Sequence, residues 1–307
     1  MTAPLRLATR KSPLALRQAE WVRAALEAVE GPGAANLVAM DTRADIDLVT
    51  PIEAFAGRGV FVTEIERAVL EGRADVAVHS AKDLPSSSPP SGLVLACVPV
   101  RADPRDCLVG RRLDELGAGA LIATGSARRR AQLAWLRPDL GFTALRGNIA
   151  TRLSKVPTGG AVVVAHAALE RLDLQPSIVE VLAEEEMLPQ VGQGALALRC
   201  RAGDGRTLDR IQRIDDPDAH RALLAERAML AYLGGGCDAP VGALARIEGA
   251  TGRVRVEGLL ASRDGHGIIR RVQFGRDPEA AGAELGAALL DAGGRAFLGE
   301  GPAGEAR

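Results

Sequence analysis

Short apolar segments alternate with helical ones along the first 200 residues, and this alternation constrains the fold more than any other feature of the sequence. Strands are expected at residues 5–8, 36–40, 74–79, 93–98, 121–123, 142–145, 161–164 and 195–199. Helices are expected at residues 13–29 and 62–71, from residue 127, around Arg152 and Lys155, and around Arg171. Strands that alternate with helices at this spacing predict an α/β protein with doubly wound sheets.

The last third of the chain has a different pattern. A long helix is expected at residues 218–233, followed by strands at 243–247, 254–260 and 268–274 and an alanine-rich helix at 278–290. Asp264 and Gly265 suit a hairpin turn between the last two strands. Strands in succession followed by a helix predict a small α+β domain at the C-terminal end.

Chemical groups cluster where the expected strand at residues 74–79 ends. Ser80, Lys82 and Asp83 place a hydroxyl, an ammonium and a carboxylate within four residues, and Pro85 stops regular structure. Open α/β sheets place their chemistry at the ends of strands. Taken alone, this segment is explained equally well as a solvated charged turn.

Positive charge is concentrated in residues 101–155, which include eleven basic and five acidic residues, although the whole chain has a net charge of −1. The arginines recur at three expected strand-to-helix junctions, which in a doubly wound fold open on one crevice. An earlier junction adds Arg10 beside Ser12, the expected cap of a helix that begins at Pro13. We therefore expect an anion-binding crevice, with a solvated helix face as the alternative explanation of an arginine run.

Composition and motif spacing exclude several classes of protein. The near-zero net charge gives no reason to expect nucleic acid or membrane partners, and no run of about 18 apolar residues predicts a membrane-spanning helix. No apolar run follows a basic start, so we expect a cytoplasmic protein. The cysteines and histidines are scattered without metal-ligand spacing, and no GxxxxGK[ST] motif occurs. We expect neither a metal nor a nucleotide.

Three glycines and Cys237 follow the expected helix at residues 218–233. Glycines after a helix supply a left-handed cap and let backbone segments approach closely. Cys237 is therefore expected on a flexible loop, where a thiol can react, whereas Cys97 and Cys200 fall within apolar strands. A structural role is the alternative for any lone cysteine.

Five groups of short motifs follow one another across nearly the whole chain: LATRKSPLA at residues 7–15, VHSAKDLP at 78–85, RGN at 146–148 with TRL at 151–153, VGQG at 191–194 and GGC at 235–237. This ordered set resembles the hydroxymethylbilane synthase (porphobilinogen deaminase) family. The resemblance implies a transferase that condenses four porphobilinogen molecules head to tail, with loss of ammonia, on a covalent dipyrromethane cofactor. Hydrolysis then releases linear hydroxymethylbilane for tetrapyrrole (haem) biosynthesis.

The resemblance also implies two periplasmic-binding-protein-like α/β domains and a small third domain. A hinge at Gly192–Gly194 is expected to return the chain to the first domain. The domains expected on this basis are residues 1–98 with 194–215, residues 99–193, and residues 216–307. The expected partner is the small molecule porphobilinogen, without nucleic acid or membrane, and the protein is expected to be a monomer.

The resemblance assigns roles to single residues through their match to the family's motifs. Asp83 matches the catalytic aspartate, and Cys237 matches the cysteine that carries dipyrromethane. The residues expected to bind the cofactor are Ser80, Lys82, Thr124, Ser126, Arg128, Arg129 and Arg146. The residues expected to bind substrate are Arg10, Ser12, Arg152 and Arg171. These residue types suit the chemistry, because arginines bind pyrrole carboxylates and a carboxylate can stabilise a cation and move protons.

Three positions depart from the family's pattern. Gly125 stands where a serine is common, Arg58 stands where a lysine is usual, and the segment 165–169, with His166, differs from the usual small-residue run. These departures bear on single substrate contacts. Two other classes of protein fit the same pattern: a non-catalytic binding protein of the same two-domain shape, and an enzyme-derived protein that has lost its activity.

Overall fold

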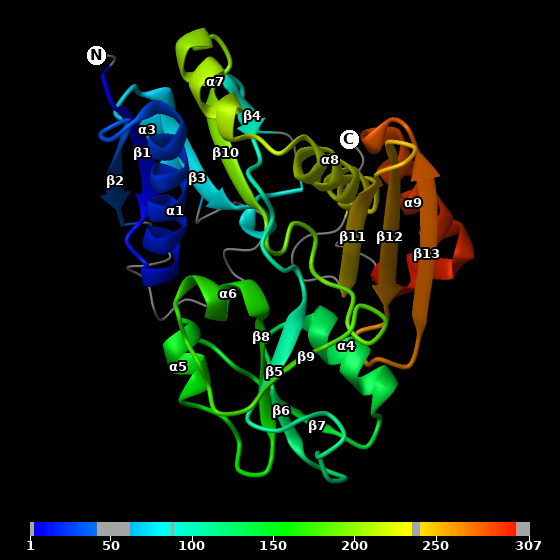
Figure 1. Ribbon diagram of the computed structural model, residues 1–307. Coiled ribbons are helices and arrows are strands. Elements are labelled where there is room, and N and C mark those ends of the chain that lie inside the picture. Colours follow the sequence, from blue (N-terminus) through cyan, green and yellow to red (C-terminus); the bar gives the residue numbers. More distant parts are fainter. Residues whose placement is uncertain (1–2, 42–61, 87–88, 235–239, 299–307) are drawn as a thin grey trace, which may run out of the picture.

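The computed structural model describes residues 3–41, 62–86, 89–234 and 240–298, which build three sheets with their helices (Figure 1). The strands are β1 (Leu5–Arg10), β2 (Ala35–Met40), β3 (Val76–Ser80), β4 (Leu93–Cys97), β5 (Asp106–Val109), β6 (Leu121–Ala123), β7 (Gly141–Thr143), β8 (Ala161–Ala165), β9 (Val179–Val181), β10 (Leu196–Arg201), β11 (Val241–Glu248), β12 (Arg253–Ala261) and β13 (Ile268–Gly275). The α-helices are α1 (Pro13–Glu30), α3 (Thr63–Leu70), α4 (Ala127–Leu136), α5 (Ile149–Leu153), α6 (His166–Arg171), α7 (Gly205–Ile211), α8 (Pro217–Tyr232), α9 (Pro278–Leu289) and α10 (Arg295–Leu298). Single turns of 3-10 or π helix cover Ala81–Asp83, Gln212–Ile214 and Leu290–Gly294.

The first sheet has the strand order β2-β1-β3-β10-β4. β1 pairs in parallel with β2 and β3, while β10 runs antiparallel between β3 and β4. Alternate residues of β1 face opposite layers: Leu5 and Leu7 pack with Val22 and Leu26 of α1, and Ala8 packs with α3. This first unit therefore has a helix on each face of its sheet.

The second sheet repeats this pattern with the order β7-β6-β8-β5-β9. β6 is parallel to β7 and β8, and β5 is antiparallel to β8 and β9. In both units the antiparallel strand comes directly after a crossing segment: residues 98–105 lead into β5, and residues 188–195 lead into β10. Each sheet is mixed rather than wholly parallel, because one of its strands enters from the other unit.

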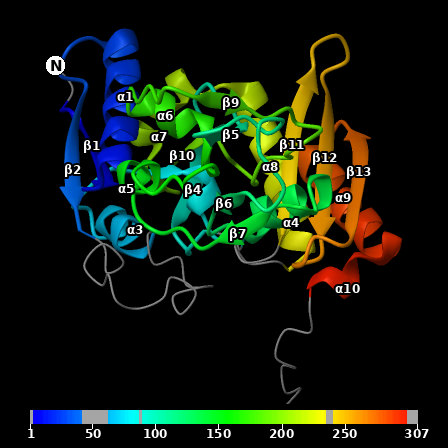
Figure 2. The same ribbon diagram turned by 90° about the horizontal axis from the view of Figure 1, so that it is seen from below.

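The third sheet, β11-β12-β13, is antiparallel, and one of its faces packs on α8 and α9. Its other face meets the second unit, where Leu244 and Leu259 pack against Ala131 of α4. α8 also reaches the first unit, since its Leu223 packs in one cluster with Ala81. Figures 1 and 2 show the third unit (yellow to red) at one side of the other two. Both crossing segments therefore have the third unit beside them.

The fold class expected from the sequence is confirmed, and most expected elements lie within about two residues of their expected limits. The expectation missed the short helices α7 and α10. It also missed β5 and β9, which have four and three residues and show no alternation of buried and exposed positions. One helix was expected to include both Arg152 and Lys155. This expectation is wrong for Lys155, because the helix, α5, ends at Leu153. The residue limits of the three domains stay a prediction, because the sheets establish only which strands belong together.

Two loops singled out in the sequence, with Arg58 and with Cys237, lie outside the described residues. Within the described ranges, no helix is long and apolar enough to cross a membrane.

α8 and α9 pack so closely that one position of their contact requires glycine. A Cβ at Gly282 would lie 2.1 Å from the carbonyl oxygen of Ala225 and 2.9 Å from the Cβ of Ala228. Because both distances are shorter than van der Waals contact and the first atom is backbone, the two helices would have to separate.

We predict that Gly282→Ala lowers the free energy of unfolding by about 1–3 kcal/mol, the usual cost of overpacking. Gly205→Ala is the matched control, because a Cβ at this first position of α7 meets nothing within 4 Å. Alanine there should leave stability unchanged or raise it by up to about 1 kcal/mol. Chemical denaturation of both variants measures the difference, and equal effects would contradict the close packing of α8 on α9.

Candidate active site

β3 ends in a single 3-10 turn, Ala81–Asp83, that presents two charged side chains. Ala81 is buried, and its backbone N–H donates to the Ala195 carbonyl at 3.0 Å. Lys82 is half-buried and Asp83 is exposed. The turn is thus fixed at its apolar start and free to present its charged end.

The second crossing segment, residues 188–195, packs against the backbone of this turn. Gly192 has φ +71°, and a Cβ there would lie 2.9 Å from the carbonyl carbon of Ala81 and 3.0 Å from the backbone nitrogen of Lys82. The amide of Gln190 also donates to the carbonyl oxygen of Lys82 at 3.4 Å. Glycine is required at residue 192 both by its backbone conformation and by the contact with the turn.

Two cavities meet at Lys82. The first, about 70 Å³, is lined by Arg10, Ser12, Leu14, Ala15, Gln18, Val62, Val78, His79, Ser80, Lys82 and Asp83. The second, about 40 Å³, is lined by Ala81, Lys82, Leu84, Ser126, Arg128, Gln190, Val191, Arg227, Leu230 and Val241. Through Lys82, the structure therefore connects residues at the ends of β1 and β3 with residues at the start of α4, one of the three junctions at which the sequence predicted a shared crevice.

The Lys82 ammonium lies in a mixed electrostatic environment. Burial lowers the pKa of Lys82 to about 8, and the nearby positive charges of Arg129 and Arg128 lower it as well. The negative charges of Asp83 and Asp106 raise this pKa and so offset part of the effect. Lys82, on the first unit, lines the second cavity together with Arg128 of the second unit. His79, which lines the first cavity, stays neutral, because burial, Arg199 and Arg10 lower its pKa to about 3.

Arg128 and Arg129 are buried, and both pair with Asp106 at the start of β5. Arg128 Nη2 lies 2.8 Å from Asp106 Oδ2, and Arg129 Nη2 lies 2.7 Å from Asp106 Oδ1. Burial raises the pKa of Asp106, but Arg128 and Arg129 outweigh this and lower it to about 2. Asp106 is therefore a permanent anion that these two arginines already hold.

The three other arginines expected from the second unit have different surroundings. Arg152 is half-buried and donates a hydrogen bond to the Gly147 carbonyl at 2.8 Å. Burial and the nearby charge of Arg129 lower the pKa of Arg152, although Asp83 partly raises it. Arg171 donates to the Gly194 carbonyl at 2.7 Å, and burial lowers its pKa to about 10. Arg146 is exposed in the loop between β7 and α5. None of these three arginines lines either cavity.

The expected hydroxyl ligands serve as caps of local structure. Ser12 Oγ accepts a hydrogen bond from the Ala15 N–H, and Ser126 Oγ accepts one from the Arg129 N–H, both at 3.4 Å. Thr124 Oγ1 accepts one from the Ser126 N–H at 3.2 Å. Because each hydroxyl uses only an oxygen lone pair in these bonds, its proton is still available to a carboxylate.

The departure at Gly125 has a steric reason in this chain. A Cβ at Gly125 would lie 2.8 Å from the carbonyl oxygen of Leu145, at the end of the segment that follows β7. Any larger residue, serine included, would push this segment away. The missing hydroxyl therefore follows from close backbone packing on the second unit.

Sequence reasoning missed three polar residues of this region: Asp106, Gln193 and Arg227. The available signals were a charged residue directly before an apolar run for Asp106, and a glutamine between two glycines for Gln193. Arg227 lines the second cavity and donates to the Pro85 carbonyl at 2.7 Å, and burial lowers its pKa to about 10. Its signal was an arginine in the apolar middle of a helix.

The side chains around Lys82 fit a ligand with several carboxylates. Arg128 lines the second cavity, and its buried Nε has no hydrogen-bond partner among the described residues. A guanidinium with an unused donor and a half-buried ammonium both favour carboxylate oxygens. In the described ranges, no group of three or more His, Cys, Asp or Glu side chains could hold a metal ion.

Comparisons of the sequence with known proteins identify the family. The family model described as porphobilinogen deaminase, dipyromethane cofactor binding domain, matches residues 5–209. The model described as porphobilinogen deaminase, C-terminal domain, matches residues 220–291. A relative from Roseiflexus castenholzii is 46% identical over 305 residues, which are 97% of this chain and 99% of the relative. A relative from Syntrophotalea carbinolica is 44% identical over 95% of this chain and 94% of its own. Both relatives are named porphobilinogen deaminase, and the chain belongs to the porphobilinogen deaminase family.

Proposed function

We propose that this chain condenses porphobilinogen head to tail, with Asp83 as the catalytic carboxylate and Cys237 as the cysteine that carries the dipyrromethane cofactor. Its family makes it a transferase of tetrapyrrole biosynthesis, a hydroxymethylbilane synthase that uses dipyrromethane. Four porphobilinogen molecules are joined with loss of ammonia, and hydrolysis releases the linear product.

The position of the Lys82–Asp83 turn carries the proposal. Lys82 lines both cavities, so whatever fills them lies beside Asp83 on one side and beside Arg128 on the other. A pyrrole chain fits these surroundings, because its carboxylates suit the cations and its ring N–H groups suit an exposed carboxylate.

When bound, dipyrromethane supplies the pyrrole ring that the next ring joins, and it brings carboxylates to the cations. Lys82, Ser126 and Arg128 would hold those carboxylates, while Arg10 and Ser12 hold the carboxylates of porphobilinogen. The other proposed ligands rest on the family match: Ser80, Thr124, Arg129 and Arg146 for the cofactor, and Arg152 and Arg171 for the substrate. Asp83 would stabilise the positive charge that forms on porphobilinogen as ammonia leaves, and would then take up the ring proton.

The three cysteines inside the sheets are poorly suited to covalent attachment, which supports Cys237 as the residue that carries the cofactor. Cys97, Cys107 and Cys200 are buried, and burial raises the pKa of each thiol, to about 12 for Cys107 and about 11 for Cys200. Since the thiolate is the reactive form, none of these three suits covalent attachment. Cys237 is the remaining cysteine of the chain.

We further propose that the protein acts as a monomer in the cytoplasm with porphobilinogen as its small-molecule partner. A reducing compartment would keep the buried cysteines as thiols.

The attachment is tested by the intact mass of protein expressed in a haem-producing host. We expect the native chain to carry the additional mass of dipyrromethane and Cys237→Ala to lack it. Cys200→Ala is the matched control, because it removes a buried thiol and should retain the additional mass. An unmodified native chain would exclude the catalytic proposal, and a modified Cys237→Ala chain would move the attachment to another residue.

We predict that Asp83→Asn retains the fold and the cofactor but lowers kcat by about 100-fold or more, the usual contribution of a positioned acid–base group. The amide keeps the shape of the side chain and removes its charge. Steady-state kinetics and intact mass measure the two properties. Asp114→Asn, an exposed carboxylate of the second unit, is the control. A kcat close to that of the native chain would remove Asp83 from the catalytic role.

The pKa of Lys82 predicts a pH dependence for the uptake of porphobilinogen by protein that lacks the cofactor. Lys82 is charged below a pKa of about 8 and loses its proton above it, so its attraction for carboxylates falls as the pH rises. We expect the uptake rate to fall about tenfold between pH 7 and pH 9. Lys82→Arg stays charged over this range and should remove the decline. The same decline in Lys82→Arg would assign the titration to another group.

A further inference from the structure

Asp106 and Gln193 form a buried connection between the arginine pair and the crossing segments. Asp106 and Gln193 are both fully buried. Asp106 Oδ1 accepts hydrogen bonds from Arg129 Nε at 3.0 Å, from Arg129 Nη2 at 2.7 Å and from Gln193 Nε2 at 3.0 Å. Its other oxygen lies 2.8 Å from Arg128 Nη2. One carboxylate thus contacts the second crossing segment and both arginines.

Asp106 determines the net charge of the buried group that it forms with Arg128 and Arg129. Two guanidinium groups buried together repel each other strongly unless an anion lies between them. With one ionised carboxylate, the group of Asp106, Arg128 and Arg129 has a net charge of +1. It can therefore bind one further carboxylate and is still stable before that carboxylate arrives. The buried Nε of Arg128 has no hydrogen-bond partner among the described residues, so this group still has an unused donor.

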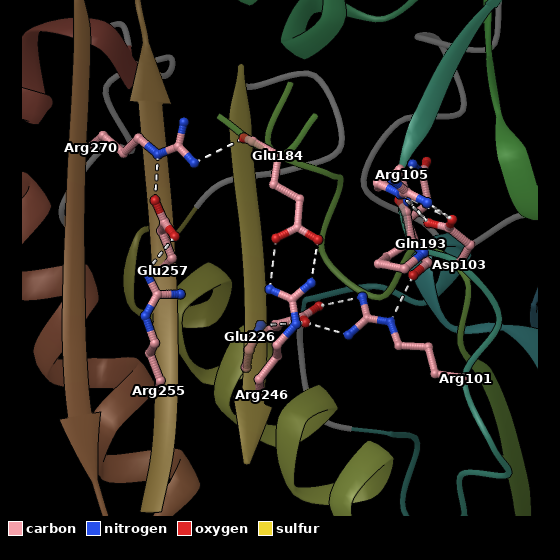
Figure 3. Close-up of polar contacts among 12 residues, drawn as sticks. Arg101, Asp103, Arg105, Glu184, Gln193, Glu226, Arg246, Arg255, Glu257 and Arg270 are labelled. Atoms are coloured by element: carbon pink, nitrogen blue, oxygen red, sulfur yellow. Dashed lines mark hydrogen bonds and ion pairs between the residues drawn. The ribbon is translucent and has the colours of Figure 1, made fainter. Parts of the chain in front are cut away.

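Gln193 connects Asp106 to both crossing segments. Its Nε2 donates to Asp106 Oδ1 at 3.0 Å and to the carbonyl of Pro104, in the first crossing segment, at 2.7 Å. The carbonyl of Gln193 accepts a hydrogen bond from Arg101 Nε at 2.9 Å, and Arg101 also pairs with Glu226 of α8 (Figure 3). Gln193 is therefore held on its backbone and on its side chain, and a shift of the crossing segments must move Asp106.

We propose that Asp106 and Gln193 are positioning residues for the binding of pyrrole carboxylates. Asp106 orients Arg128 and Arg129 and reduces the net charge of the group to +1. Gln193 links the crossing segments to Asp106, so that a shift of these segments would also move the two arginines. This inference rests on the proposed function and adds to it two residues that contact neither substrate nor cofactor.

The test compares Asp106→Asn, Gln193→Met, the double variant and Glu30→Gln. Asp106→Asn keeps the shape of the side chain and removes the charge, and Gln193→Met keeps the length and removes both donated hydrogen bonds. Glu30→Gln is the matched control, because Glu30 is a largely buried carboxylate that also pairs with two arginines, Arg210 and Arg213, away from both cavities. The readouts are the fraction of chains that carry the cofactor by intact mass, KM and kcat for porphobilinogen, and the thermal midpoint.

We expect Asp106→Asn to lower the fraction of loaded chains and to raise KM by about tenfold or more, with a smaller change in kcat of the chains that are loaded. Gln193→Met should raise KM by about three- to tenfold. The double variant should match Asp106→Asn within about twofold, since both residues act through one pair of arginines. Glu30→Gln should lower the thermal midpoint and leave loading and KM unchanged.

Three outcomes would overturn the inference: native loading and KM in Asp106→Asn, effects that multiply in the double variant, or the same KM change in Glu30→Gln. If Asp106→Asn does not fold, Gln193→Met decides alone, and a native KM would refute the coupling. A native chain without cofactor and without turnover would instead reject the proposed function. The two failures are therefore distinguishable.

Discussion

One buried carboxylate, that of Glu226 in α8, joins the three units, and the arrangement of the cavities depends on it. Glu226 is fully buried; Oε2 accepts a hydrogen bond from the Gly192 N–H at 2.7 Å, and Oε1 accepts one from the Ala245 N–H at 2.9 Å. Arg101, from the first crossing segment, pairs with the same group at 2.5 Å. Because an isolated buried charge is unfavourable, these partners stabilise one another only in this arrangement. Gly192 in turn rests against Ala81, so the same constraint extends to the Lys82–Asp83 turn.

The buried guanidinium groups around the crevice are compensated by carboxylate and carbonyl groups of the chain itself. A site for a polyanion needs many cations, yet buried cations repel one another and destabilise the fold when no ligand is bound. Asp106 compensates Arg128 and Arg129, and backbone carbonyls accept hydrogen bonds from Arg152 and Arg171. Each of these partners is weaker or less complete than a bidentate carboxylate. These contacts compensate the buried guanidinium groups when no ligand is bound, and in the proposed function ligand carboxylates would give them stronger partners.

The sequence predicted those parts of the fold and site that depend on local pattern. The cap of α1 at Ser12 and the turn after β3 were both expected, because a capping hydroxyl before Pro13 and a charged turn before Pro85 are local signals. Asp106 was missed, since its importance arises from contacts with residues more than twenty positions away in α4 and in the second crossing segment. β5 was missed with it, because a strand of four buried residues has no periodicity to detect. The steric reason for Gly125 likewise lies in a distant carbonyl.

The charge environment also explains why a lysine suits residue 82 in a chain with so few lysines. An arginine would stay charged whatever surrounds it, and beside Arg128 and Arg129 it would add a permanent repulsion. Lysine is a point charge whose protonation responds to its neighbours, and burial with the two arginines lowers its pKa to about 8. Each carboxylate that arrives near Lys82 stabilises the ammonium and raises that pKa. With a pKa of about 8, Lys82 is mostly charged at neutral pH, and the carboxylates of the proposed ligand would raise that pKa further.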